Sequence, residues 1–168
     1  MAPLLYWSLT ALLVVVLILL GLWAFQTANR LNRLHVRYDL SWQALDAALA
    51  RCAVVARAIA ADAYRATTQG TRLRALADAA ERAPRYAREG CENELSTDLT
   101  LLDADVVPLA LMDELAEAES RVLLARRFHN DAVRDTLALR EQRPVRWLKL
   151  GGHAPLPTYF EIAETAQR

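Results

Sequence analysis

Five polar side chains in the second half of the chain are the residues best placed to do chemistry together. They are Glu119, Arg121, Arg126, Asn130 and Asp131, all on one predicted helix. Glu119 and Arg126 are two helical turns apart, so both can face one seam of a bundle. Trp42 and Asp46 of an earlier predicted helix are expected to meet them there. Such a seam could bind a ligand or a partner, but we favour a structural role, in which ion pairs and hydrogen bonds fix the helix register.

Other residue types that carry enzyme chemistry are present, but their spacing does not suit catalysis. His35, His129 and His153 are isolated in sequence, and only Asp131 lies near one of them, so no metal-ligand pattern appears. The one pair of adjacent glycines follows no predicted strand, which argues against a phosphate-binding loop. The serines in helical patterns have no neighbouring histidine to activate them. We therefore predict no catalytic residues, no metal, no cofactor and no enzyme activity.

An unbroken apolar run, LLYWSLTALLVVVLILLGLWAF, occupies residues 4–25 and contains no charged side chain. As a helix rising about 1.5 Å per residue it would measure roughly 33 Å, enough to cross a hydrocarbon core of about 30 Å. Trp7 and Trp23 lie near its two ends, where aromatic residues favour the membrane interface. We therefore predict a single transmembrane helix over residues 4–25, with the lipid bilayer as its partner.

A cleaved signal peptide is the competing interpretation of this run. It would need a basic residue before an apolar core of about 7 to 15 residues, followed by a small-x-small cleavage site, and the sequence offers none of these clearly. Arg30, Arg33 and Arg37 follow the run, so the positive-inside rule predicts an N-terminus outside and a cytoplasmic domain. Lysine occurs once among the 20 basic residues, which together with abundant alanine indicates a GC-rich bacterial genome. The predicted location is thus a bacterial inner membrane.

Composition limits the remaining residues, 26–168, to one domain of ordinary size. The chain has 20 basic and 20 acidic residues and a formal net charge of zero. It therefore lacks the basic surface of a nucleic-acid-binding protein, and we predict no nucleic acid partner. Cys52 and Cys91 are too far apart for a metal or thioredoxin motif. We expect free thiols, with one disulfide as the alternative if the domain faced an oxidising compartment.

Apolar residues in steps of three and four predict a helical bundle after the apolar run. Residues 22–69 contain no proline or glycine, so the membrane helix is expected to continue unbroken to Gly70. A second helix is expected from Thr71, broken or bent at Pro84. A third is expected from Pro108, with no breaker before the next proline. The predicted fold is all-α: an N-terminal transmembrane helix that continues into an antiparallel bundle of three long helices, with a short C-terminal helix.

The tail after Pro144 is rich in glycine and proline and is predicted to be irregular. Thr158 and Glu161 have the spacing of a capping box, which predicts a short final helix. If three helices run out, back and out again, Trp147 and Leu148 lie at the far tip of the bundle, away from the bilayer, and do not act as membrane anchors. There they would cap the open end, which we favour, or form an apolar docking spot.

Two stretches of the chain resemble the LemA family of membrane-anchored helical proteins. The first follows the apolar run and matches the family at Asn29, Arg37, Trp42 and Asp46. The second is more specific and matches at Glu119, Arg121, Ala125, Arg126, Phe128, Asn130, Asp131, Ala132, Val133 and Pro144. The closing aromatic-Phe-Glu motif is matched by Tyr159, Phe160 and Glu161. The chain departs from the family at Arg57, where proline is expected, and so resembles a divergent member.

This resemblance implies an inner-membrane protein with a bundle of long helices and without catalytic residues to carry over. We divide the chain into an N-terminal tip at 1–3, a transmembrane helix at 4–25 and a LemA-like bundle domain at 26–168. The predicted function is a non-enzymatic scaffold or adaptor for other proteins, which the sequence does not identify. The alternative is a membrane-tethered sensor that binds a small ligand or metal between its helices. An accessory subunit of an envelope protease or transporter would look the same in sequence.

Overall fold

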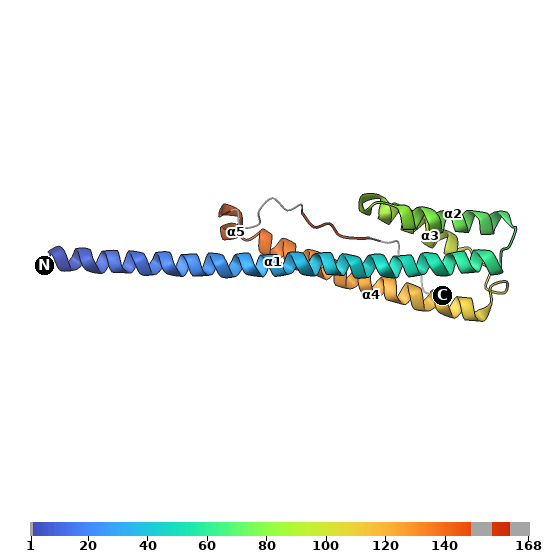
Figure 1. Ribbon diagram of the computed structural model, residues 1–168, viewed down its shortest axis with the longest axis horizontal. Helices are drawn as coiled ribbons and strands as arrows, with labels where there is room; N and C mark the ends of the chain where they lie inside the picture. The colour runs from blue at the N-terminus through green and yellow to red at the C-terminus, as the bar shows by residue number, and fades with distance from the viewer. Residues whose placement is uncertain (1, 149–155, 162–168) are drawn as a thin grey trace. The chain divides into compact units, whose positions relative to one another are not determined.

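The computed structural model describes residues 2–148 and 156–161 of the chain. Within these residues it forms five α-helices and no strand (Figure 1). The predicted all-α class is confirmed, as is the long apolar N-terminal helix that leads into a helical bundle. The chain divides into two compact units. The first unit comprises residues 1–38 and 132–157, and the second comprises residues 39–131 and 158–168.

Helix α1 spans Ala2–Asp62 as one uninterrupted element. Among the described residues it is the one helix long and apolar enough to cross a membrane, judged by length and composition. Its large apolar side chains from Tyr6 to Phe25 are exposed, whereas Thr27 is 9% exposed and Leu31 is 2% exposed. Protein packing against α1 therefore begins just beyond the predicted transmembrane run.

In the first unit, α1 packs antiparallel against the last turns of α4, which spans Leu109–Arg140. Arg37 pairs with Asp135 at 3.1 Å. Earlier on α1, Leu31 packs against Leu139, which lies further along α4. Position therefore increases along one helix as it decreases along the other.

The short helix α5, Arg143–Trp147, follows α4 in the first unit. Sequence analysis predicted an irregular tail here, but Pro144 stands in the first helical turn, where a helix has no partner for an N–H in any case. Val145 is 1% exposed and packs in the same apolar cluster as Leu31, with Leu34 at its edge. This one inward side chain holds α5 against α1.

The second unit is a four-segment helical bundle built from the end of α1, two short helices and the start of α4. Helix α2 spans Thr68–Arg82 and α3 spans Arg85–Thr100. In this unit too, α1 and α4 run antiparallel, because Ser41 of α1 contacts His129 while Arg51, later on α1, pairs with the earlier Glu114 at 3.2 Å. The core is rich in small side chains, which let helices approach closely: Ala53, Ala56, Ala60, Ala77, Ala80 and Ala118, together with Ile59, Leu73 and Leu95.

A tight turn at residues 63–67 separates α1 from α2, earlier in the chain than expected. Helix α1 ends at Asp62, and Ala66, within the turn that follows, adopts the left-handed conformation with φ of 61°. The Thr67 hydroxyl then accepts a hydrogen bond from the Gly70 N–H at 3.0 Å and so caps α2. Gly70 is buried in the first turn, where a Cβ atom would collide with the Tyr64 carbonyl. This glycine therefore serves a close backbone approach, and not the end of α1 that its sequence position indicated.

The expected break at Pro84 is a full reversal of the chain. The residue before it, Ala83, has extended backbone (φ −64°, ψ 132°), as sterics before a proline require. Helices α2 and α3 form an antiparallel hairpin, since Arg72 near the start of α2 pairs with Asp98 near the end of α3 at 2.9 Å. A bent single helix would have kept the chain direction, whereas the hairpin inverts it.

This inversion overturns the far-tip position predicted for Trp147 and Leu148. With α2 and α3 running in opposite directions, α4 returns antiparallel to α1, and α5 packs beside Leu31 in the first unit. Figure 1 shows α5 beyond the end of α4, toward the apolar part of α1. The two residues therefore lie near the end of the predicted transmembrane run, and the prediction of a remote bundle tip is wrong.

The predicted C-terminal helix falls partly within the described residues. Residues 156–161 carry no regular secondary structure, although Thr158 and Glu161 were expected to begin a helix. The remainder of that prediction, residues 162–168, lies outside the described residues. Instead of starting a helix, residues 158–161 form part of the second unit and lie against its helices.

Candidate functional site

The most specific polar contact in the second unit is made by Asn130 on α4 with the C-terminal segment. Its amide Nδ2 donates to the Phe160 carbonyl oxygen at 3.1 Å, and its Oδ1 accepts from the Phe160 N–H at 3.0 Å. One side-chain amide thus satisfies both main-chain groups of one residue, as a neighbouring strand would. The next residue, Glu161, donates its N–H to Glu89 Oε2 on α3 at 3.3 Å. These hydrogen bonds hold the segment by its main chain.

The Phe160 side chain is the anchor of this segment and is 3% exposed. It packs in one apolar cluster with Leu45 and Leu49 of α1, and Val122 and Ala125 of α4 lie at the edge. We call the residues that surround the segment the tail site, namely Trp42, Leu45, Leu49, Glu89, Val122, Ala125, His129 and Asn130. A fully buried phenylalanine and a paired backbone together resemble how proteins recognise extended peptides.

Trp42 forms the aromatic wall of the tail site. Its ring meets Phe160 edge to face with centroids 5.8 Å apart, and His129 in the same manner at 5.6 Å. The guanidinium carbon of Arg85 lies 4.0 Å from the Trp42 ring centroid, a distance at which cation–π attraction is favourable. Trp42 therefore joins α1, α3, α4 and the C-terminal segment at one point.

His129 is buried within this wall. Burial lowers its pKa, the positive charge of Arg85 lowers it further, and a hydrogen bond with the Thr158 backbone opposes both. A second hydrogen bond joins His129 Nδ1 and Ser41 Oγ at 3.1 Å. The imidazole thus has partners on α1 and on the C-terminal segment, which suits a structural role better than proton transfer.

A buried ion-pair network lies next to the tail site, with Arg88 of α3 at its centre. The Arg88 side chain is 5% exposed; its Nε donates to Glu92 at 2.8 Å, and its Nη1 pairs with Asp46 of α1 at 3.1 Å. Nη1 also donates to the Glu81 carbonyl of α2 at 3.2 Å. Burial raises the pKa of Glu92, and the Arg88 hydrogen bond and charge offset part of that rise. One guanidinium therefore links three helices.

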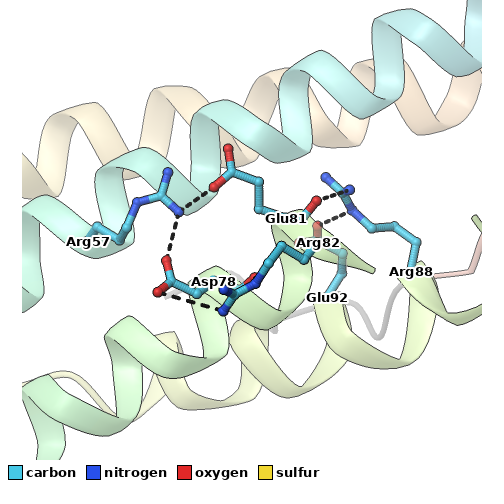
Figure 2. A network of polar contacts seen from close by, with 6 residues as sticks. All are labelled: Arg57, Asp78, Glu81, Arg82, Arg88 and Glu92. Carbon is cyan, nitrogen blue, oxygen red and sulfur yellow. Dashed lines mark hydrogen bonds and ion pairs between the residues drawn. The ribbon is translucent and has the colours of Figure 1, made fainter. Parts of the chain in front are cut away.

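Figure 2 shows how this network continues toward Arg57 of α1. Arg57 pairs with Glu81 at 2.6 Å and with Asp78 at 3.3 Å, both on α2, and Asp78 also faces Arg82 at 3.9 Å. These groups are partly exposed, so the pairs contribute modestly to stability but fix how α2 lies on α1. Arg57, where the LemA pattern has proline, has a structural role in this chain.

The structure brings two of the predicted seam residues together at the tail site. Trp42 and Asn130 meet at Phe160, as described above, while Asp46 faces Arg88. Arg121 pairs with Glu117 at 2.6 Å on the solvent side of α4, where both side chains are 63% exposed. The other three predicted residues also lie on α4, half-buried or exposed, and each has interaction partners: Glu119, Arg126 and Asp131.

The remaining predicted residues, Trp147 and Leu148, are exposed by 90% and 52% respectively. They belong to the first unit, with Arg143 and Arg146 beside them. Trp147 lines a shallow, open hollow together with Arg143, Pro144 and Arg146. Neither Trp147 nor Leu148 caps the helix end. Val145 is the α5 residue that packs inward.

The cysteines and the acidic residues offer no reactive centre in the described part of the chain. Both cysteines are free thiols, as expected. Burial raises the pKa of Cys52 to about 12, with the charges of Glu119 and Glu92 adding to the effect, so this thiol is not a nucleophile at neutral pH. Among the described residues, no three histidine, cysteine or carboxylate side chains are grouped as metal ligands. The chemistry that the arrangement supports is recognition of peptide groups.

Sequence reasoning identified Asn130 and the Tyr-Phe-Glu ending, but not that they touch. It missed Arg88 and Glu92, which lie shortly after the predicted break at Pro84. An arginine and a glutamate four residues apart on a helix form a recognisable pair, but nothing in the sequence indicates that the pair is buried.

Comparisons of this chain with protein-family models, with curated protein sequences and with solved structures find no match. The resemblance to the LemA family therefore rests on the quoted residues.

Proposed function

We propose that this protein is a membrane-anchored, non-enzymatic adaptor of the LemA type, which binds partner proteins through extended segments that carry a phenylalanine. The observation that supports the proposal is the tail site, where Asn130 pairs with the backbone of Phe160 while its ring is buried. In this proposal, residues 158–161 occupy the site in the absence of a partner. A partner segment of similar chemistry replaces them.

The anchor in this proposal is the exposed apolar part of α1. One helix of suitable length and composition is present, and its side chains are uncovered up to Phe25. We further propose a bacterial inner membrane with the N-terminus outside and the bundle in the cytoplasm. The arginines at positions 30, 33 and 37, directly after the apolar part, support this orientation.

The alternative function, a sensor that binds a small ligand or metal between helices, would need space in the bundle. In the described part of the second unit the helices meet through closely packed alanine, leucine and valine side chains. The buried polar groups around Arg88 are occupied by one another. These observations favour the adaptor over the sensor.

Peptide binding to the full-length protein in lipid nanodiscs tests the proposal. The probe is a fluorescent peptide with the sequence LPTYFE, that of residues 156–161. We expect it to bind a Phe160→Ala variant, whose own tail no longer fills the site, and to bind wild type far more weakly. The matched double variant, Asn130→Ala with Phe160→Ala, should bind the probe roughly 5- to 150-fold more weakly than Phe160→Ala alone, because it lacks the two hydrogen bonds to the phenylalanine backbone. A probe with alanine in place of phenylalanine should not bind.

A photo-crosslinker at Glu89, which contacts the tail backbone, extends the test to cells. With Phe160→Ala we expect adducts to a second protein through a phenylalanine-containing segment, and with wild type mainly to the protein's own tail. Circular dichroism shows whether each variant retains its helices. Equal peptide binding by the double variant, or none by Phe160→Ala, would refute the tail site as a recognition site.

A further inference from the structure

Helix α5 lies close to the level on α1 at which the headgroup layer of a bilayer would end. Val145 packs in one cluster with Leu31, six residues after Phe25, the last apolar residue of the run. At about 1.5 Å per residue, Leu31 is roughly 9 Å beyond the end of that run. The polar layer on each side of a bilayer is about 5–8 Å thick. Val145 is therefore just at the outer edge of this layer if the run spans the hydrocarbon core.

The exposed side of α5 faces no protein in the described residues. Figure 1 shows α5 beyond the end of α4, toward the apolar part of α1. With Val145 turned inward, Trp147, two positions further along the helix, lies on the opposite side of α5 and is 90% exposed. Leu148, directly after α5, is 52% exposed. Tryptophan is enriched at membrane interfaces because its ring is apolar and its N–H is polar.

Charge on the same short helix matches an anionic surface. Arg143 and Arg146 are exposed, and within the part of the chain that the structure describes neither pairs with a carboxylate. They line the open hollow together with Pro144 and Trp147. A guanidinium binds phosphate oxygens with parallel hydrogen bonds. An arginine near an anionic membrane strengthens attachment roughly fivefold.

We propose that α5 is a second membrane contact, in which Trp147 and Leu148 enter the headgroup layer and Arg143 and Arg146 bind lipid phosphates. The occupant of this surface is the same bilayer that α1 crosses, so the inference rests on the membrane anchor of the proposed function. It is independent of the tail site. The contact would hold the end of α4 at the membrane surface.

Photo-crosslinking to lipid in nanodiscs tests this contact with the full-length protein. A photoreactive residue replaces Trp147 in one sample, Leu13 within the apolar run in a second, and the 91% exposed Tyr86 of α3 in a third. We expect lipid adducts by mass spectrometry at positions 147 and 13 and none at 86. In nanodiscs containing phosphatidylglycerol, Arg143→Gln with Arg146→Gln should lower the yield at position 147 by about fivefold or more.

The outcomes separate the two proposals. Adducts at position 13 but not at 147 would overturn the α5 contact while keeping the anchor. No lipid adduct at either position would overturn the anchor itself. Equal yields at position 147 from phosphatidylglycerol and phosphatidylcholine, unchanged by the double arginine variant, would retain the aromatic contact and refute phosphate binding by the arginines. Unchanged helicity of each variant excludes unfolding as the cause.

Discussion

Replacement of Asn130 should release the C-terminal segment while leaving the bundle folded. Asn130→Ala removes two hydrogen bonds to Phe160, of 3.1 and 3.0 Å. Each is worth about 0.5–1.5 kcal/mol net, so tail docking should weaken by about 1–3 kcal/mol, or roughly 5- to 150-fold. Burial of the Phe160 ring remains available, which is why the loss is partial.

Asn130→Asp is the matched variant of the same size. It keeps an acceptor for the Phe160 N–H but replaces the donor to the Phe160 carbonyl with a second acceptor. Repulsion between these oxygens should loosen the tail at neutral pH at least as much as alanine does. Protonation of the new carboxyl at acid pH should restore part of the contact.

Hydrogen exchange followed by mass spectrometry measures this release directly. The Glu161 amide, whose acceptor Glu89 is unchanged in both variants, is expected to exchange 5- to 150-fold faster, because it is protected only while the tail is docked. Exchange in the α2–α3 hairpin serves as the internal control and should be unchanged. If tail exchange stays at the wild-type rate, or if the hairpin accelerates equally, Asn130 does not hold the segment as the structure indicates.

Three further predictions concern the stability of the second unit. Arg88→Met leaves Glu92 buried without its partner and should lower the free energy of unfolding by about 3–5 kcal/mol, whereas adding Glu92→Leu should recover most of the loss in denaturant titrations. Burial and a neighbouring arginine lower the pKa of His129 below its ordinary 6.5, so the unfolded chain takes up the proton first. Stability should therefore be complete above pH 6.5 and fall as the pH drops below it, and His129→Gln should flatten this slope in thermal melts. Gly70→Ala forces a Cβ atom against backbone and should cost more than about 1 kcal/mol, while the control Gly90→Ala, with open space around it, should stabilise α3 by about 0.5–1 kcal/mol.

Local patterns in the sequence predicted the helices well, because apolar spacing and proline act within a few residues. The apolar run, the unbroken course of α1 and the break at Pro84 were all predicted this way. The end of α1 was placed too late because the turn at residues 63–67, which includes the left-handed Ala66, contains no glycine or proline to mark it in the sequence. Gly70, the expected stop, is instead required by a close contact with the preceding turn.

These local patterns could not predict the direction of each helix or the contacts between residues that are far apart in the sequence. A proline indicates that a helix breaks, but whether the chain bends or reverses depends on packing partners such as Arg72 and Asp98, which are 26 residues apart. That one choice moved Trp147 from the expected bundle tip to the region near Leu31. For the same reason, the Asn130 contact with Phe160 could not be predicted from either residue alone.

The long sequence separation between α1 and α4 has a consequence for biosynthesis. Ser41 contacts His129, which follows it by 88 residues in the sequence. Arg37 contacts Asp135, which follows it by 98 residues. At about 5–20 residues per second, the ribosome needs roughly 4–20 s to make the partner of α1 after α1 itself. During that interval the α2–α3 hairpin, synthesised directly after α1, is the first segment able to cover alanines 53, 56 and 60. The hairpin would then cover the apolar face of α1 in the nascent chain until α4 is made. Variants that weaken the hairpin should be degraded or aggregate before α4 emerges.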